Sequence, residues 1–473
     1  MSTMTGDDTE ETEESADNYS NSRVYNWLDD RLGVQDKFLG KAFPEDEYAS
    51  FLLGEVSLFS FAILVLTGTF LGLLYVPAVA PVEYIGQVAK YHNKEVPAAF
   101  ASVLRITYDV RFGMFVRYLH HWASYLFIAA MTLHMLRVLF SGAYRNPREI
   151  NWMVGASILF ISLLEGVFGY ALPFDEFSAT ATSITLEIAG SVPFIGHEIV
   201  MLVFGGEWPT GASAVIPRLF FLHVFLVPLV IAGLVGVHMF LLVRQKHTEQ
   251  AGAREPHDPP KDDQSVVVGT PLVPNQTYVT LVVFFMTLGV LSFLAGFLPL
   301  QRIAVFGPSD PTTTPAGVGP DWFLLWTFGY LKMVPSYYFG LSELLGGVSL
   351  AEFFGGVLIP GIVGTVLVLW PFIDYSSKEV HFTADPIRRP VPTAVAVAGI
   401  AHIMMASLAG MNNIVATITG IPSGKLQLPL QLSMIVVPVV WGFLTYWLLK
   451  RRKERENTVD PSHAAAGLTE SDD

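Results

Sequence analysis

Four histidines lie inside long apolar segments of the chain, where an ionisable side chain is costly and is functional by default. His120 and His134 share the segment RYLHHWASYLFIAAMTLHMLR, and His223 and His238 share RLFFLHVFLVPLVIAGLVGVHMFLL. The separations are 14 and 15 residues, which corresponds to about 21 Å along an α-helix. At about 100° per residue, they also return the second histidine to within roughly 40° and 60° of the first one's face.

Two such helices running in the same direction place two imidazoles at one depth and two at another. Facing histidines on neighbouring helices are the arrangement that axial ligation of a haem requires in a helical bundle. The alternative is that each histidine merely forms hydrogen bonds with neighbouring backbone. That alternative does not require two matching depths, so the pattern favours two haems, one held by His120 and His223 and one by His134 and His238.

Glycines repeat the histidine interval on two further apolar segments. Gly54 and Gly68 are 14 residues apart, as are Gly155 and Gly169. A porphyrin lying close to a helix requires side chains to be absent there, so we expect these glycines at the two haem depths. Close helix–helix contact is the other common reason for glycine in a membrane helix.

Three arginines stand close to the histidines and could supply counter-charges. Arg117, Arg137 and Arg218 lie three to five residues from a histidine of their own segment. We expect them to pair with haem propionates. At helix ends they could instead extend to the membrane interface.

Composition and apolar runs indicate an all-α membrane protein. The chain has 473 residues, of which 52% are hydrophobic and 15% charged, less charge than a soluble domain carries. A bilayer core of roughly 30 Å needs about 20 apolar helical residues. We expect about eight transmembrane helices, which form an N-terminal four-helix di-haem bundle and further C-terminal helices: Phe51–Val76, Tyr118–Phe140, Trp152–Leu172, Leu219–Val243, Tyr278–Leu298, Phe353–Ile373, Thr393–Met411 and Leu430–Leu449.

Basic residues predict the orientation of these helices, because cytoplasmic loops are enriched in Lys and Arg. The loops after the second, fourth and sixth spans and the KRRKER tail are basic, whereas residues 173–217 contain no Lys or Arg. We therefore expect a multi-pass protein of the cell (plasma) membrane with both termini in the cytoplasm. The loop after the first span is also basic and fits this alternation less well.

The same features divide the chain into five parts. We expect a disordered acidic tail (1–23), a di-haem domain (24–246), a linker (247–276), a domain with four helices (277–450) and a basic, then acidic, C-terminal tail (451–473). The chain contains no cysteine, so it cannot form disulfides, ligate an iron–sulfur cluster or attach a haem through thioether bonds. Both expected haems are therefore non-covalent.

The histidine pairs, the glycines and GYALPFD (169–175) resemble cytochrome b of the bc1 and b6f complexes. The interval of 15 is similar to the b6 branch. The C-terminal half resembles subunit IV of b6f complexes through TTTPAGVGPDWF, PFID and DPIRRP. The b6-like and subunit IV-like parts are fused in one chain, with an extra last helix. The acidic tail and the excess of Arg over Lys suggest a salt-loving, haloarchaeal source.

The resemblance implies a subunit of a quinol-oxidising respiratory complex. His120 and His223 would ligate a low-potential haem near the outside, and His134 and His238 a high-potential haem near the cytoplasm. Arg244 and Lys246 would border a quinone-reduction site. The implied quinol-oxidation site consists of Pro320, Asp321, Trp322 and Phe323 together with the turn that includes Gly169, Tyr170 and Pro173.

The resemblance also implies partners: a Rieske-type iron–sulfur protein, a cytochrome c or copper-protein acceptor, and a second copy of the complex in a homodimer. The sequence departs from the family at three places. Asp321 and Phe323 replace Glu and Tyr of the family's PEWY motif, and Phe174 replaces Trp of its LPWD motif. The cysteine that anchors an extra haem in b6 is replaced by Leu52 or Leu53, which puts that haem in doubt.

Three alternatives stay open at this point. Asp321 could accept a quinol proton, or it could cap the helix that begins at WFLLW. Glu165 could extend a proton path or be a hydrogen-bonded structural acid. Finally, a di-haem membrane anchor of a quinone-linked dehydrogenase would also carry four ligating histidines, although the PDWF and GYALPFD segments argue against it.

Overall fold

The computed structural model describes residues 42–43, 48–245, 270–271, 276–315, 317–376, 383 and 385–459. The expected acidic tail 1–23, most of the linker 247–276, residues 460–473 and Lys246 lie outside these ranges. Within the described residues, eight helices are long and apolar enough to cross a membrane. This confirms the expected number of spans. Their bounds are Leu52–Gly72, Gly113–Ser141, Glu149–Ala171, Ala212–Gln245, Thr277–Phe297, Leu350–Val368, Pro390–Gly410 and Ser423–Glu456.

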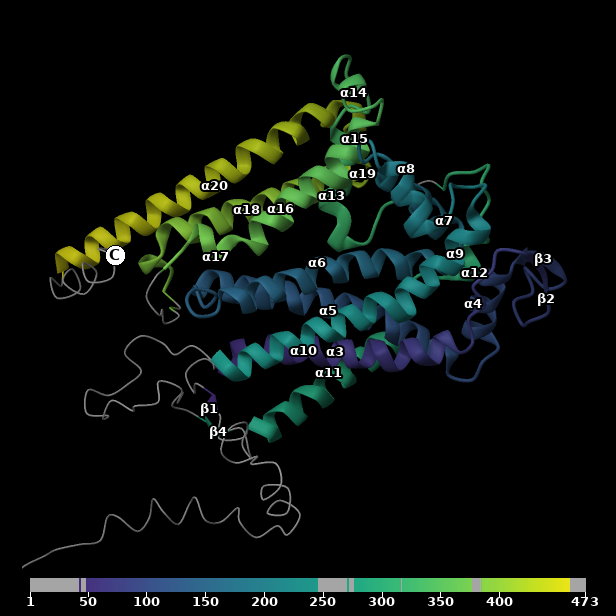
Figure 1. Cartoon of the computed structure of the whole chain (residues 1–473), viewed down its shortest axis with the longest axis horizontal. Helices are drawn as coiled ribbons and strands as arrows, with labels where there is room; N and C mark the ends of the chain where they lie inside the picture. Colours follow the sequence, from purple (N-terminus) through teal and green to yellow (C-terminus); the bar gives the residue numbers. More distant parts are fainter. Residues whose placement is uncertain are drawn as a thin grey trace, which may run out of the picture.

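The first four spans form a bundle of long helices lying side by side (Figure 1). Its middle is closed by Phe127, Ile158 and Ile231, which come from three of the helices and are all buried. These residues separate the two histidine depths. The helices are α3 (Tyr48–Gly72), α5 (Gly113–Ser141), α6 (Glu149–Ala171), and a fourth one built from α9 (Ala212–Phe221), η4 (Leu222–Leu226) and α10 (Val227–Gln245).

The fourth helix contains a π-helical turn, Leu222–Leu226, directly at His223. The N–H of Val227 donates to the carbonyl of Leu222, five residues earlier. Such a turn is wider than an α-helical turn and often occurs at functional sites. It accommodates one more residue for the same advance, so 15 residues from His223 to His238 cover the same helix face as 14 residues on α5. In a regular α-helix, an interval of 15 residues would offset the two histidines by about 60° around the helix axis. The π-helical turn reduces this offset.

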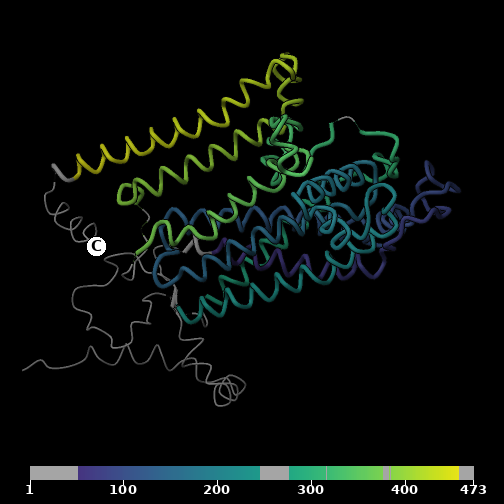
Figure 2. The backbone as a smooth tube through the Cα atoms, turned by 45° about the horizontal axis from the view of Figure 1, so that its top comes forward, coloured from purple at the N-terminus to yellow at the C-terminus, as the bar shows by residue number. Residues whose placement is uncertain are grey.

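The C-terminal half packs as a second group of helices, which Figure 2 shows as a green and yellow layer beside the bundle. Glycines let α13 and α18 approach closely, because a Cβ at Gly329 would lie 2.0 Å from the carbonyl oxygen of Ala406. The fifth span, α11 (Thr277–Phe297), packs instead on α3 and α5 through Leu291 and Ala295. The group consists of α13 (Leu325–Met333), η7 (Phe353–Leu358), α16 (Ile359–Val368), α18 (Pro390–Gly410) and α20 (Ser423–Val459).

Short elements gather mainly at the ends of the long helices (Figure 1). Strands β2 (Pro81–Tyr84) and β3 (Lys94–Pro97) form an antiparallel hairpin before α4 (Ala98–Tyr108), and β1 (Ala42–Phe43) pairs with β4 (Thr270–Pro271). The remaining elements are α7 (Glu176–Gly190), α8 (Gly196–Ile199), η3 (Val200–Phe204), α12 (Ile303–Phe306), η6 (Trp322–Leu324), α14 (Leu341–Leu344), α15 (Leu350–Glu352), α17 (Trp370–Ile373), η8 (Pro386–Arg388) and α19 (Asn412–Thr419).

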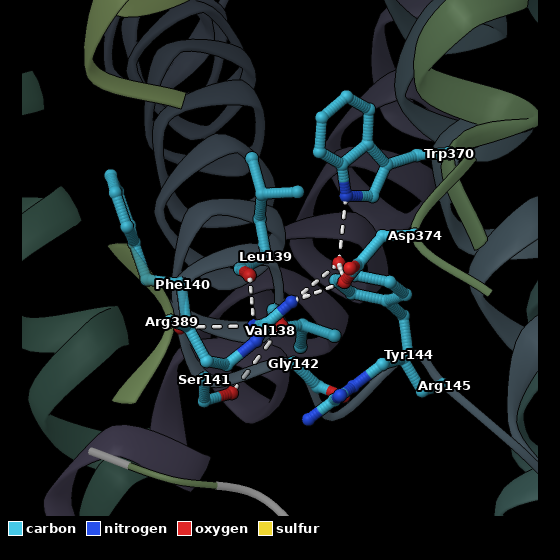
Figure 3. Close-up of polar contacts among 10 residues, drawn as sticks. All are labelled: Val138, Leu139, Phe140, Ser141, Gly142, Tyr144, Arg145, Trp370, Asp374 and Arg389. Atoms are coloured by element: carbon cyan, nitrogen blue, oxygen red, sulfur yellow. Dashed lines mark hydrogen bonds and ion pairs between the residues drawn. The ribbon is translucent and has the colours of Figure 1, made fainter. Parts of the chain in front are cut away.

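A buried polar network joins the two halves at the end of α5 (Figure 3). The Arg389 guanidinium pairs with the Asp374 carboxylate and donates to the Tyr144 hydroxyl over 2.8 Å. It also donates to the carbonyls of Leu139 and Phe140 at the end of α5. Arg389 is only 7% exposed, so its charge is stabilised almost entirely by these contacts. The network fixes the start of α18 against the N-terminal four-helix bundle.

Candidate functional site

The structure brings His120 and His223 together as a facing pair. Their ring centres are 6.1 Å apart and their planes are nearly perpendicular, at 82°. The Nδ1 atom of His120 lies 2.9 Å from the Thr67 hydroxyl, and Nδ1 of His223 lies 2.7 Å from a Glu165 carboxylate oxygen. In each ring Nε2 therefore remains for a metal. Two histidine–metal bonds of about 2 Å each fit between rings at this spacing.

The four glycines lie one for one against the four histidine rings. A Cβ added at Gly54 would lie 3.4 Å from the His134 ring, and one added at Gly68 would lie 3.2 Å from His120. The corresponding distances are 3.1 Å from Gly155 to His238 and 2.4 Å from Gly169 to His223. The sequence predicted that the glycines leave room for a porphyrin. In the structure their direct neighbour is the imidazole, because each ring rests on the glycine of the adjacent helix.

His134 and His238, which we expect to be the inner pair, lie on the same two helices as His120 and His223, the expected outer pair. The Nδ1 atom of His238 is 3.2 Å from the backbone carbonyl of Asn151. Among the described residues, Nδ1 of His134 is buried without a hydrogen-bond partner. Because Gly54 and Gly155 each face one ring of this pair, the inner level repeats the construction of the outer level.

An apolar cavity opens around the outer histidine pair, and its lining includes Arg117. One guanidinium nitrogen of Arg117 donates to the backbone carbonyl of Gln301 over 2.9 Å. Its other terminal nitrogen, Nη1, is buried and has no partner among the described residues. Facing histidines, a tight glycine contact and a buried unsatisfied cation beside an apolar cavity together fit a bis-histidine haem with an anionic edge.

The other two arginines occupy different positions. Arg137 lies one helical turn beyond His134 on α5. Arg218 is exposed and donates to the carbonyls of Met201 and Leu202 at the end of η3. It is not among the described residues that line the cavity. The propionate contacts expected of Arg137 and Arg218 stay predictions.

A second cavity adjoins the first one, and four residues line both: Gly166, Tyr170, Asp321 and Phe323. The Tyr125 hydroxyl donates to the Asp321 carboxylate over 2.5 Å. Asp321 stands at the N-cap position of η6, but its side chain makes no capping hydrogen bond. Burial raises the pKa of the Asp321 carboxyl, and the hydrogen bond from Tyr125 lowers it by a smaller amount. The structure thus argues against the cap, and the role of Asp321 as a proton acceptor stays a hypothesis.

The neighbours of Asp321 have separate positions in this region. Pro320 lines the second cavity. Phe323 is buried and closes the wall, with its ring 3.1 Å from where a Cβ of Gly166 would be. Trp322 is 44% exposed and is not among the described lining residues of either cavity. The expected quinol-site residues are therefore brought together except for Trp322.

The GYALPFD turn is held in place by its last two residues. Phe174 adopts a positive φ of 52° and packs against Trp208. Asp175 is fully buried and forms a capping box with Ser178 at the start of α7. Burial raises the pKa of this carboxyl despite the hydrogen bonds from Ser178. In this turn, Tyr170 lines both cavities and Pro173 lines the first one.

Of the expected quinone-reduction residues, Arg244 lies at the other end of the bundle. Arg244 is exposed in the last turn of α10, with its guanidinium 5.8 Å from the centre of the Phe240 ring. Lys246 lies outside the described residues. The role of both residues stays a prediction.

Sequence reasoning missed Tyr125 and Thr67. Tyr125 is 196 residues from Asp321, and Thr67 contacts His120 from a different helix. Neither residue has an unusual neighbour in the sequence, so only the packing of the helices reveals these contacts. Glu165 was noticed, but its partner His223 was not assigned.

Comparison with known proteins identifies the family. Residues 125–308 match the family model for cytochrome b (N-terminal)/b6/petB, and residues 308–421 match that for cytochrome b (C-terminal)/b6/petD. The chain is 35% identical to the cytochrome bc1 complex cytochrome b subunit of Mycobacterium leprae over 86% of this chain and 72% of that protein. It is 34% identical to the cytochrome bc1 complex cytochrome b subunit of Streptomyces coelicolor, over 88% of this chain and 75% of that protein.

A solved structure is also similar in fold. A chain of a hyperthermophilic respiratory complex III superposes with a TM-score of 0.63 and 24% identity, covering 89% of this chain and 99% of that one. The alternative of a di-haem dehydrogenase anchor is set aside by the curated relatives. The chain belongs to the cytochrome b family and is the cytochrome b subunit of a quinol-oxidising respiratory complex of the bc1 type.

Proposed function

We propose that this subunit carries electrons inward across the membrane through two non-covalent b haems, from a quinol-oxidation site near the outer surface to a quinone-reduction site near the cytoplasm. The observation that carries this proposal is the facing pair of His120 and His223 at 6.1 Å. His134 and His238 lie further along the same helices, each against a glycine of a neighbouring helix. Haem and quinone binding are general properties of the family to which the chain belongs.

Bound haems would supply one-electron carriers at two depths. His120 and His223 hold the outer one, and His134 and His238 the inner one. Arg117 supports the outer site because its buried Nη1 needs an acceptor, and a propionate provides one. Arg137 is the corresponding candidate at the inner site. Gly54, Gly68, Gly155 and Gly169 keep the rings in place.

Quinol oxidation requires an acceptor for protons near the outer surface. Asp321 has the chemistry for this role, since its carboxylate lines both cavities and holds a hydrogen bond from Tyr125. Tyr170, Pro320 and Phe323 shape the pocket around it. We place quinol in the second cavity, next to the first one. At the opposite end, Arg244 and Lys246 would border bound quinone.

Quinol oxidation releases two electrons. One passes to the haems of this chain, and the other needs a different acceptor. This chain contains no cysteine and cannot hold an iron–sulfur cluster. A separate Rieske-type protein would therefore accept it and pass it to a cytochrome c or a copper protein, within a complex that we expect to be a homodimer. The basic loops and the basic end of α20 (Lys450, Arg451, Arg452, Lys453 and Arg455) support cytoplasmic termini in the plasma membrane.

A redox titration of the purified complex, followed by its optical spectrum, tests the proposal. Two b-type components per chain with different midpoint potentials are expected, and both should be extracted by acidified acetone. A single component, or a haem that stays with this chain in a denaturing gel, would contradict it.

A further inference from the structure

The outer histidine ligand His223 differs from the other three in the partner of its Nδ1 atom. Nδ1 lies 2.7 Å from a carboxylate oxygen of Glu165 and 3.2 Å from the backbone carbonyl of the same residue. The Nδ1 atoms of His120 and His238 are paired with the neutral oxygens of Thr67 and Asn151. Within the described part of the chain, only His223 has a carboxylate at this position.

The helix that carries Glu165, α6, also carries the corresponding residue at the other histidine level, Asn151. Glu165 lies four residues before Gly169, and Asn151 lies four residues before Gly155, so each shares a helix face with its glycine. Both backbone carbonyls lie 3.2 Å from Nδ1 of the histidine at their level. The two levels therefore have the same backbone contact, and the acidic side chain is the difference between them.

The Glu165–His223 contact is shielded from water. The side chains of Glu165 and His223 are 15% and 18% exposed. The second carboxylate oxygen of Glu165 is buried and has no hydrogen-bond partner among the described residues. In such an environment a charge interacts more strongly with its neighbours than it does in water.

A histidine that binds iron through Nε2 keeps its proton on Nδ1 and donates it. A carboxylate acceptor makes the ring a more basic, more electron-donating ligand. It thereby stabilises ferric over ferrous iron, which lowers the reduction potential. A backbone carbonyl or a hydroxyl does so less, because it carries no net charge.

We propose that Glu165 is a positioning residue that acts through His223 to lower the reduction potential of the outer haem, and that this contact helps to keep it below that of the inner haem. The inference rests on the proposed ligation by His223. It assigns to Glu165 a task distinct from proton transfer, since its carboxylate is engaged by a ligand histidine.

The test is a redox titration of the complex carrying Glu165→Gln, a substitution that removes the charge and keeps the shape. The ferric-to-ferrous ratio of the outer haem at a fixed potential should fall about tenfold or more, which is an upward shift of about 59 mV for a one-electron couple. The inner haem should not shift. Glu165→Asn, which gives the outer level the side chain of the inner level, should shift the outer haem in the same direction.

Two matched controls separate charge from packing. Glu165→Asp keeps the carboxylate and should shift the outer haem less than either neutral variant. Thr67→Val removes a neutral partner from the opposite ligand, His120, and should also have the smaller effect. Unchanged outer potential in Glu165→Gln, with both haems present, would overturn the proposal. So would loss of the outer haem from both neutral variants, because Glu165 would then be needed to hold the ligand.

Failure of this inference is distinguishable from failure of the proposed function. If His223→Ala removes the outer haem but Glu165→Gln leaves its potential unchanged, the ligation stands and only the tuning role is wrong. If His223→Ala leaves both haems in place, the ligation itself is wrong.

Discussion

The Tyr125 hydroxyl donates a hydrogen bond of 2.5 Å to the Asp321 carboxylate, joining the second span to the loop after the fifth. This contact distinguishes between the two interpretations of Asp321, a helix cap and a proton acceptor. A capping aspartate turns its carboxylate back to the first turn of its own helix, whereas Asp321 directs it to another helix, at the wall between the two cavities. Asp321 is therefore available to chemistry at that wall.

Asp321→Asn should slow quinol oxidation by about 10²–10⁴-fold, the usual contribution of general-base help. Asn is similar in shape and caps helices about as well as Asp, so a structural role predicts near-normal turnover. The measurement is steady-state quinol oxidation, with the haem spectra as a control for folding. Asp321→Glu restores the family's usual residue and should retain activity. Wild-type turnover in Asp321→Asn would rule out the proton-acceptor role.

Tyr125→Phe should move the acid limb of the rate profile to higher pH. The hydrogen bond from Tyr125 lowers the pKa of Asp321, against the larger effect of burial. Its loss raises that pKa further, and the accepting carboxylate is then protonated at a higher pH as the pH falls. The dependence of kcat/KM on pH reports this group in the free enzyme. A limb that stays in place, or moves to lower pH, would argue against Asp321 as the titrating group.

Gly169→Ala should disturb the outer haem, because the new Cβ would lie 2.4 Å from the His223 ring and force the ring to move. Gly54→Ala is the matched control at the inner level. There the Cβ would lie 3.4 Å from His134, an ordinary van der Waals contact. Haem content and reduced-minus-oxidised spectra check both variants. Equal behaviour of the two substitutions would contradict the tight packing of the outer ring.

Arg389→Met should destabilise the complex by about 3–5 kcal/mol, since it leaves the Asp374 carboxylate and two helix-end carbonyls without their buried cation. Arg388→Met is the control one residue earlier. Arg388 is half exposed, and its ion pair with Asp385 is long, at 4.0 Å. Its loss should therefore cost less than about 1 kcal/mol. Thermal unfolding of the detergent-purified complex measures the difference. Similar unfolding temperatures for both variants would show that the network in Figure 3 does not join the halves.

The spans and the histidine pairs could be predicted from the sequence because both depend on regular periodicity. Twenty apolar residues define a span, and an interval of 14 returns a residue to its helix face. The π-helical turn at His223 could not be predicted, because it depends on local backbone geometry. The contact of Arg218 with η3 could not be predicted either, because the accepting carbonyl of Leu202 is 16 residues away in the sequence.

Partners of individual side chains were also beyond the sequence. Glu165 and His223 are 58 residues apart, and Tyr125 and Asp321 are 196 apart. Neither pair belongs to a repeated interval of the kind that predicted the histidine pairs. The first contact follows from the packing of α6 against the fourth helix, and the second from the position of the start of η6 beside α5.

We propose above that two pairs of histidines hold two haems at two depths. The most direct measurement is a redox-resolved optical spectrum of four complexes, carrying His120→Ala, His223→Ala, His134→Ala or His238→Ala. We expect the first two substitutions to remove the same, lower-potential haem and the last two to remove the other one. Loss of the same haem from all four variants, or loss of different haems within one pair, would contradict it.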